Sequence, residues 1–195
     1  LPYRMPRDLL EREIDGILSL GIDLELGAAL GADFTVEQLL GERGFAAVCL
    51  AVGAHQGMRL SVPGEDAEGI EEGLWFLRRV FLDDDRAVGR QVLVVGGGDA
   101  AIDAARTAVR LGANEVKILY RRTEDEMPAA PEEVAAAREE GVEIVFQAVP
   151  VGFEKDGARV GAARVVRTEP GEPDRSGRRR PVPVPGSEVR TVTDH

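Results

Sequence analysis

Residues 92–101 read VLVVGGGDAA, and this stretch decides the fold of the chain. A short apolar run rich in valine that ends at glycines is typical of a buried parallel strand, and the alanines that follow favour a helix. A strand, a glycine turn and a helix in this order begin a βαβ unit of about 30 residues. We therefore predict an α/β fold built around a parallel sheet.

The glycines of this turn also predict a ligand. Gly96 suits a tight turn, Gly98 lets the backbone approach a pyrophosphate, and Ala101, in place of a further glycine, still permits close packing of the helix on the strand. The helix N-terminus presents free N–H groups and partial positive charge to an anion. We expect a dinucleotide site, and the alternative is a tight connection between strand and helix that binds nothing.

The end of the next strand indicates which dinucleotide is bound. Sites for NAD place an acidic residue about 20 positions after the turn, where it holds the ribose 2′-hydroxyl. This chain has Arg121 and Arg122 there, directly after Tyr120. Guanidinium groups bind a 2′-phosphate through charge-assisted hydrogen bonds, whereas a carboxylate repels it. The pair favours NADP(H), and the alternative is a solvated pair that bridges to the acidic residues 124–126.

The pattern of apolar residues, glycines and prolines predicts the remaining elements. We expect helices between Pro6 and Gly21, at 34–40 with Thr35 as its cap, from the glycine turn to Leu111, and at 131–140. We expect strands at 22–26, 45–52, 92–95, 116–120, 142–146 and 164–166, and a loop or hairpin at 169–186. Cys49, in the second of these strands, is interpreted as a small core residue. Residues 74–77 favour the core too, and the alternative is an exposed apolar patch around Trp75.

The composition excludes several classes of function. The 195 residues carry 24 Lys and Arg against 35 Asp and Glu, a net charge of −11, which argues against nucleic acid or an anionic membrane as the main partner. A single cysteine and two distant histidines, His55 and His195, suggest no disulfide, iron–sulfur cluster or zinc site, so we expect no metal ligands. No segment reaches the ~20 apolar residues of a membrane span, and we expect a cytoplasmic protein.

No residue has the pattern of a catalytic acid, base or nucleophile. Hydride transfer between cofactors requires none, because the cofactors carry the chemistry. Asp99 caps the helix, orients the glycine turn or touches a cofactor ribose, and the sequence leaves these roles open. We expect Asp103 and Arg106 to form an ion pair within the helix, and residues 178–180, three arginines, to lie in a solvated loop.

Short motifs along nearly the whole chain point to one family. They include YRMP at 3–6, LAVGA at 50–54, VPGE at 62–65, GGGD at 96–99, DAART at 103–107, YRRT at 120–123, EMPA at 126–129 and the loop 171–186. Together they resemble the small subunit of NADPH-dependent glutamate synthase and its relatives, flavoproteins among the pyridine nucleotide oxidoreductases. The same module forms part of dihydropyrimidine dehydrogenase and of several iron–sulfur flavoprotein complexes.

The resemblance implies an NADPH-binding domain inserted into a discontinuous FAD-binding domain. Residues 56–195 are expected to form a Rossmann-like, three-layer NAD(P)-binding domain, and residues 1–55 part of the FAD-binding domain. The cofactor-binding residues that it implies are Gly97, Gly98, Asp99 and Ala100 at the NADP pyrophosphate, Arg121 and Arg122 at the 2′-phosphate, and Arg4 and Gly53 near FAD. Gly96 and Ala101, which shape the turn, complete the predicted cofactor-binding residues.

The function that the resemblance implies is transfer of hydride from NADPH to FAD, with electrons passing onward through iron–sulfur clusters to a partner subunit. The family's cysteine-rich region and first FAD glycine motif are not in this sequence, so we expect a fragment that binds FAD weakly without the remainder of the FAD domain. One competing function is a non-catalytic NADP-binding regulatory module. Another is a stand-alone dehydrogenase, which lacks an evident proton-transfer pair such as Tyr-x-x-x-Lys.

Overall fold

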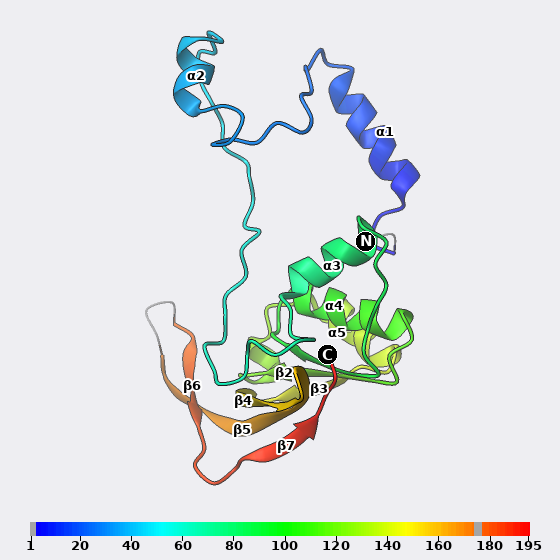
Figure 1. The fold of residues 1–195 in the computed structure, drawn as a ribbon, viewed down its shortest axis with the longest axis vertical. Helices are drawn as coiled ribbons and strands as arrows, with labels where there is room; N and C mark the ends of the chain where they lie inside the picture. Colours follow the sequence, from blue (N-terminus) through cyan, green and yellow to red (C-terminus); the bar gives the residue numbers. More distant parts are fainter. Residues whose placement is uncertain (1–2, 174–176) are drawn as a thin grey trace. The chain divides into compact units, whose positions relative to one another are not determined.

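The computed structural model describes residues 3–173 and 177–195 and divides the chain into two compact units, Leu1–Ala54 and His55–His195 (Figure 1). The first unit contains two helices, whereas the second contains both sheets and the other helices. In the ranges that the structure describes, no helix is long and apolar enough to cross a bilayer.

In the first unit, helix α1 (Arg7–Leu18) and helix α2 (Val36–Gly41) form where the sequence predicts them. Thr35 caps α2 as expected, since its hydroxyl accepts from the Gln38 N–H at 3.2 Å and the Gln38 side chain accepts from the Thr35 N–H at 3.0 Å. None of residues 3–54 is buried. These residues therefore build no core of their own.

Two strands predicted in this unit are wrong. Residues 22–26 and 45–52 are not strands, and Cys49, expected in the core, is exposed. A strand satisfies its N–H and C=O groups by pairing with a neighbour. Neither segment has a partner strand among the residues described here. A short apolar run therefore did not suffice to form a strand.

The second unit is built on a parallel sheet in the order β1-β2-β3. Its strands are β1 (Gln91–Val95), β2 (Glu115–Tyr120) and β3 (Glu143–Phe146), close to the predicted bounds. The helices of this unit are α3 (Gly73–Phe81), α4 (Asp99–Arg110) and α5 (Pro131–Glu139), with a 3-10 turn, η1, at Glu124–Glu126.

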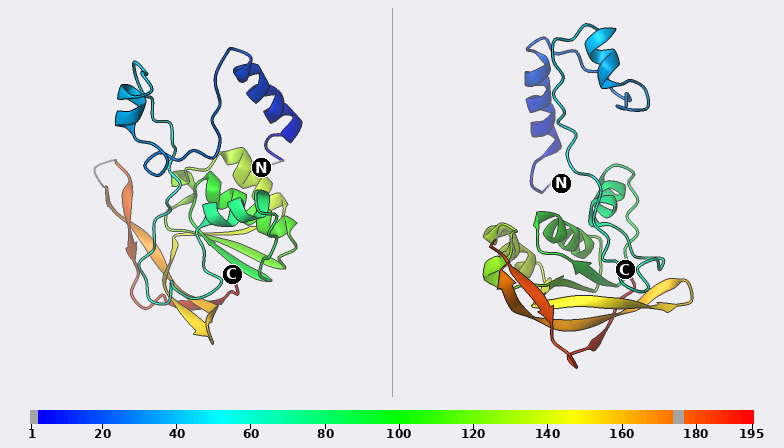
Figure 2. Two further views of the ribbon diagram at one scale, coloured as in Figure 1. Left: turned by 45° about the horizontal axis from the view of Figure 1, so that its top comes forward. Right: turned by 90° about the vertical axis from the view of Figure 1, so that its left-hand side faces the viewer.

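Alternate side chains of the parallel strands enter two different cores. Val92 and Ile118 pack with the helices, whereas Leu93 and Leu119 pack with an antiparallel sheet on the opposite face. Figure 2 shows the helices, the parallel sheet and the antiparallel sheet as successive layers of this unit. The three-layer α/β fold predicted from the sequence is confirmed.

The antiparallel sheet centres on one long strand. It consists of β4 (Ala148–Asp156), β5 (Arg159–Pro173), β6 (Arg179–Pro183) and β7 (Val189–Val192), and β5 pairs with each of the others. The pairing of β5 with β6 confirms the hairpin expected at 169–186, of which residues 174–176 lie outside the described residues. The sequence did not predict β4, because Pro150 and Gly152 both disfavour strands and only pairing with β5 overcomes this.

Helix α3 carries the apolar group at 74–77, and only part of this group is in the core. Phe76 is 5% exposed and Leu77 packs against the same core, whereas Trp75 is 53% exposed. The expected burial of Trp75 is therefore wrong. With about 3.6 residues per turn, consecutive helical residues point in different directions and do not share one buried face.

A buried arginine joins two helices that cover the parallel sheet. Arg106 of α4, which we expected to pair within its own helix, reaches across to Glu140 at 2.8 Å and to Glu133 of α5. Arg110 also reaches Glu140, at 2.7 Å. The hydrogen bonds from Arg110 and Arg106 lower the pKa of the Glu140 carboxyl to about 2, against the opposing effect of burial.

Replacing Glu140 by glutamine is expected to lower the free energy of unfolding at pH 7. A carboxyl whose pKa falls on folding contributes stability above its ordinary pKa of 4.5 and loses it as the pH falls towards the folded value of about 2. The difference from wild type should be largest above pH 4.5 and shrink below it. Urea unfolding at several pH values tests this, with Glu139→Gln as the exposed control; a difference independent of pH would contradict it.

Candidate functional site

The glycine turn joins β1 to α4 and is attached to the end of β2. Gly96 has a φ of 147°, a conformation that favours glycine, and its N–H donates to the Leu119 carbonyl at 3.0 Å. A Cβ at Gly96 would lie 3.3 Å from the Cβ of Ala101. The small side chain at 101 therefore lets α4 begin close to the strand, as the sequence predicts.

Gly97 lies against an aromatic ring. A Cβ at this position would stand 2.3 Å from Cδ2 of Tyr120 and 2.5 Å from its Cε2. Tyr120 is buried, and its hydroxyl donates to the Glu126 carbonyl at 2.6 Å, while the Gly97 carbonyl accepts from the Ala129 N–H at 3.1 Å. The ring thus joins the turn to the loop that follows β2.

Gly98 is the N-cap of α4. Its backbone is extended, with φ −93° and ψ 174°, and its carbonyl accepts from the N–H groups of Ala101 and Ile102 at 2.9 and 3.2 Å. A Cβ at Gly98 would meet nothing within 4 Å, and Ala100 is exposed. Because the first N–H groups of a helix lack helical acceptors and carry partial positive charge, this end of α4 offers an open surface to an anion.

Asp99 does not cap its own helix. Its Oδ1 accepts from the N–H of Ala130, the N-cap of α5, at 3.2 Å. The carboxylate therefore joins the starts of two helices. Of the roles that the sequence left open, this contact supports orientation of the turn.

The two arginines after β2 differ in their surroundings. Arg121 is exposed, and its carbonyl accepts from the Thr168 hydroxyl at 2.8 Å. Arg122 is 8% exposed, and its Nε donates to the carbonyl of Arg179 on β6 at 2.9 Å. The guanidinium of Arg121 therefore lies at the surface, one residue beyond the ring that contacts the turn, whereas Arg122 is held against the β5-β6 hairpin.

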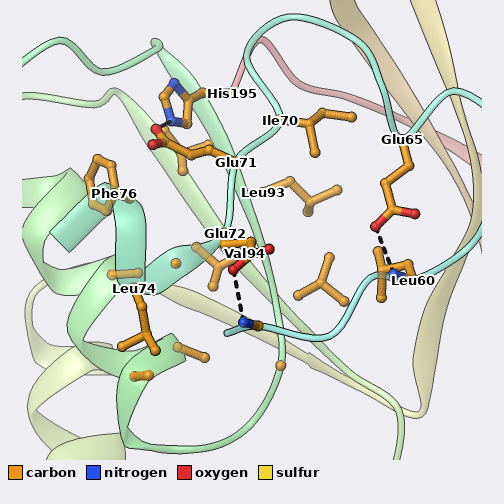
Figure 3. A pocket seen from close by; sticks show the side chains of 18 of the residues that line it. Leu60, Glu65, Ile70, Glu71, Glu72, Leu74, Phe76, Leu93, Val94 and His195 are labelled. Atoms are coloured by element: carbon orange, nitrogen blue, oxygen red, sulfur yellow. Dashed lines mark hydrogen bonds and ion pairs between the residues drawn. The ribbon is translucent and has the colours of Figure 1, made fainter. Parts of the chain in front are cut away.

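A cavity of about 460 Å³ is lined by β1, the glycine turn and the start of α4, but not by β2 (Figure 3). Residues 57–60 and 69–74 form its opposite wall. Much of its lining is apolar and includes Leu74, Leu93 and Val94. Because β1 is the edge strand of the parallel sheet, the cavity lies on the side of β1 away from β2.

Glutamates at the cavity bind neighbouring groups. Glu65 accepts from the N–H groups of Leu60 and Ser61, both at 2.7 Å, and Glu72 accepts from the Gly57 N–H at 2.9 Å. These bonds hold the segment 57–61 in place as a wall of the cavity. They also satisfy carboxylates that would otherwise face an apolar space.

Glu71 is the third of these glutamates. It lies 2.6 Å from Nη2 of Arg79 and 2.8 Å from Nε2 of His195. Burial acts to raise the pKa of Glu71, but hydrogen bonds from His195 and Arg79 outweigh it and lower the pKa to about 2. The sequence could not reveal this cluster, because Glu71 and His195 are 124 positions apart and form no motif.

The expected site residues divide between the two units. Residues 96–101, Arg121 and Arg122 all belong to the second unit, and the structure gathers them at the carboxyl ends of β1 and β2. Arg4 and Gly53, which the resemblance places near FAD, belong to the first unit and are both exposed.

Comparison with known proteins identifies the family. The model of the pyridine nucleotide-disulphide oxidoreductases matches residues 20–175. The chain belongs to this family. The match covers the βαβ unit, the glycine turn and both arginines after β2.

Curated members of the family confirm the resemblance to glutamate synthase small subunits. The NADPH-Fe(3+) oxidoreductase subunit beta of Geobacter sulfurreducens is 47% identical, over 99% of this chain and 29% of its own length. The NADP(+)-dependent formate dehydrogenase subunit beta of Moorella thermoacetica is 45% identical, over 95% of this chain and 26% of its own length. The glutamate synthase [NADPH] small chain of Escherichia coli K12 is 39% identical, over 95% of this chain and 42% of its own length. The chain thus spans less than half the length of each.

Solved structures share the fold. FprA, an oxidoreductase of Mycobacterium tuberculosis, superposes with a TM-score of 0.65 at 19% identity, over 85% of this chain and 52% of its own. FprA in complex with NADPH gives a TM-score of 0.57 at 18% identity, over 74% of this chain and 47% of the FprA chain. These likenesses confirm the fold of a pyridine nucleotide-disulphide oxidoreductase.

Gly97→Ala is expected to reduce the free energy of unfolding by about 1–3 kcal/mol, the usual cost of overpacking, because the added Cβ overlaps the Tyr120 ring. Gly98→Ser is the matched control. Serine is favoured at an N-cap, and the position is open, so its effect should stay within about 0.5 kcal/mol. Thermal unfolding compares the proteins, and a Gly97→Ala variant as stable as wild type would argue against the contact.

Proposed function

We propose that this chain is the NADPH-binding module of a flavin-dependent oxidoreductase, in which hydride passes from NADPH to FAD. The observation that carries the proposal is the exposed Arg121 at the carboxyl end of β2, beside the Tyr120 ring that contacts the glycine turn. A 2′-phosphate calls for a cationic group at this position, and a carboxylate there would favour NADH instead.

The glycine turn fits the pyrophosphate. Space is open at Gly98, Asp99 and Ala100 are exposed, and the start of a helix presents N–H groups and partial positive charge to an anion. A side chain at Gly98 would enter the space that a phosphate requires. We therefore assign the pyrophosphate to the residues of the turn and the helix start: Gly96, Gly97, Gly98, Asp99, Ala100 and Ala101.

The two halves of the dinucleotide belong on opposite sides of β1. In Rossmann folds the ligand lies across the carboxyl ends of the strands. The phosphorylated adenosine fits on the side of β2, where Arg121 lies, and the nicotinamide fits on the other side, where the cavity of about 460 Å³ opens. The apolar side chains of that cavity would exclude water from the nicotinamide ring.

Bound NADPH supplies the hydride, which carries two electrons and one proton, and FAD accepts it. The residues of this chain bind and orient the nicotinamide cofactor, and none is assigned a role as acid, base or nucleophile. Arg4 and Gly53 are proposed to approach FAD. Since the relatives are named as a beta subunit or a small chain, we infer that electrons continue from FAD to a partner subunit, and the family resemblance adds iron–sulfur clusters to that path.

Calorimetric titration with NADPH and NADH tests the proposal. We expect the chain to bind NADPH at least about tenfold more tightly, because one charge-assisted hydrogen bond to a phosphate is worth roughly 1.5–3 kcal/mol. Arg121→Ala should remove most of this preference and leave NADH binding unchanged. Equal affinities for the two nucleotides in the wild-type chain would contradict the assignment of Arg121.

Binding of FAD is expected to be weak in this chain alone. No residue in 3–54 is buried, and the chain spans only 29% of the NADPH-Fe(3+) oxidoreductase subunit that it resembles, so we propose that it holds only a small part of a flavin site. Quenching of FAD fluorescence on titration with the chain measures this, with NADPH binding in the same preparation as the control for folding. A tightly bound yellow flavin in the purified chain would refute the expectation.

A further inference from the structure

The β5-β6 hairpin is attached at two points to the arginines that follow β2. The Thr168 hydroxyl of β5 donates to the Arg121 carbonyl at 2.8 Å, and the buried Arg122 donates from Nε to the Arg179 carbonyl of β6 at 2.9 Å. The N–H of Arg179 also interacts with the Glu126 carboxylate. The Arg179 carbonyl is therefore held by the buried side chain of Arg122.

This attachment brings a third arginine to the end of β2. Arg121, Arg122 and Arg179 line one small pocket that has no room for a water molecule, although Arg179 lies 57 positions after Arg122. Arg179 is exposed. The three residues come from the end of a parallel strand and from the edge of the antiparallel sheet, and together they concentrate positive charge in a chain whose net charge is −11.

Acidic residues line the same pocket and bear on its charge. They are Glu126 and Glu169. The Glu126 carboxylate accepts from the Thr123 hydroxyl at 2.9 Å, and this bond, with the nearby Arg122, keeps its pKa below the ordinary value. Arg122 thus offsets the charge of Glu126 and holds the Arg179 carbonyl. Among the three arginines that line this pocket, Arg121 and Arg179 are exposed.

We propose that Arg179 is a second residue that recognises the 2′-phosphate of NADPH, acting with Arg121, and that Arg122 is the positioning residue that holds the Arg179 backbone. The inference rests on the proposed function and refines its specificity. Successive side chains of a strand point to opposite faces, so Arg180, the exposed neighbour of Arg179 on β6, points away from the site.

Titration of Arg179→Ala with NADPH and NADH tests the proposal, with Arg180→Ala as the matched control of equal charge change. Arg179→Ala should weaken NADPH binding about tenfold and change NADH binding by less than about twofold, while Arg180→Ala leaves both within about twofold. Equal losses in the two variants would reduce the effect to general electrostatics and overturn the proposal. Normal NADPH selectivity in Arg179→Ala, lost in Arg121→Ala, would overturn it and leave the proposed function standing.

The role of Arg122 has its own readout. Arg122→Met removes the bond to the Arg179 carbonyl, so it should weaken NADPH binding and spare NADH binding. The double variant Arg122→Met, Arg179→Ala should then bind NADPH about as well as Arg122→Met alone, because both changes act on one contact. Fully additive losses would contradict the positioning role. Failure of the wild-type chain to bind either nucleotide would overturn this inference and the proposed function together.

Discussion

The contact of the Gly97 backbone with the Tyr120 ring is the constraint on which the site depends. No side chain fits between them, so the turn after β1 lies directly on the end of β2. The hydrogen bond from the Gly96 N–H to Leu119 fixes the same approach. As a result, the open N-terminus of α4 and the exposed Arg121 lie at one edge of the sheet, where dinucleotides bind in α/β folds.

The antiparallel sheet contributes to the site as well as covering the parallel strands. Leu119 packs against it, which places the carboxyl end of β2 beside β4 and β5. Thr168 and Arg179 then reach the residues that follow β2. The adenosine side of the site is thus built from segments that are far apart in the chain, and it depends on the third layer of the fold.

The distribution of charge explains how an acidic chain can recognise a phosphate. Carboxylates such as Glu140 and Glu71 are bound by arginines within the second unit, and Glu126 lies beside Arg122. Exposed guanidinium groups remain at the carboxyl end of β2. Because charge interactions are screened beyond about 8–10 Å in physiological salt, local charges decide recognition of a phosphate and the net charge has little influence on it.

By itself the sequence determined the βαβ unit, the glycine turn and the position of the arginine pair, because a tight turn and a helix depend on near neighbours and β1 pairs with β2, the next strand along the chain. It was wrong for 22–26 and 45–52, which find no partner strand among the described residues, and it missed β4 (Ala148–Asp156), where Pro150 and Gly152 hide a strand that forms only by pairing with β5. Only the tertiary structure decided that Arg121 is exposed and Arg122 is buried against β6. Two adjacent arginines are chemically identical, and only their surroundings in the fold, solvent for Arg121 and the β5-β6 hairpin for Arg122, distinguish them.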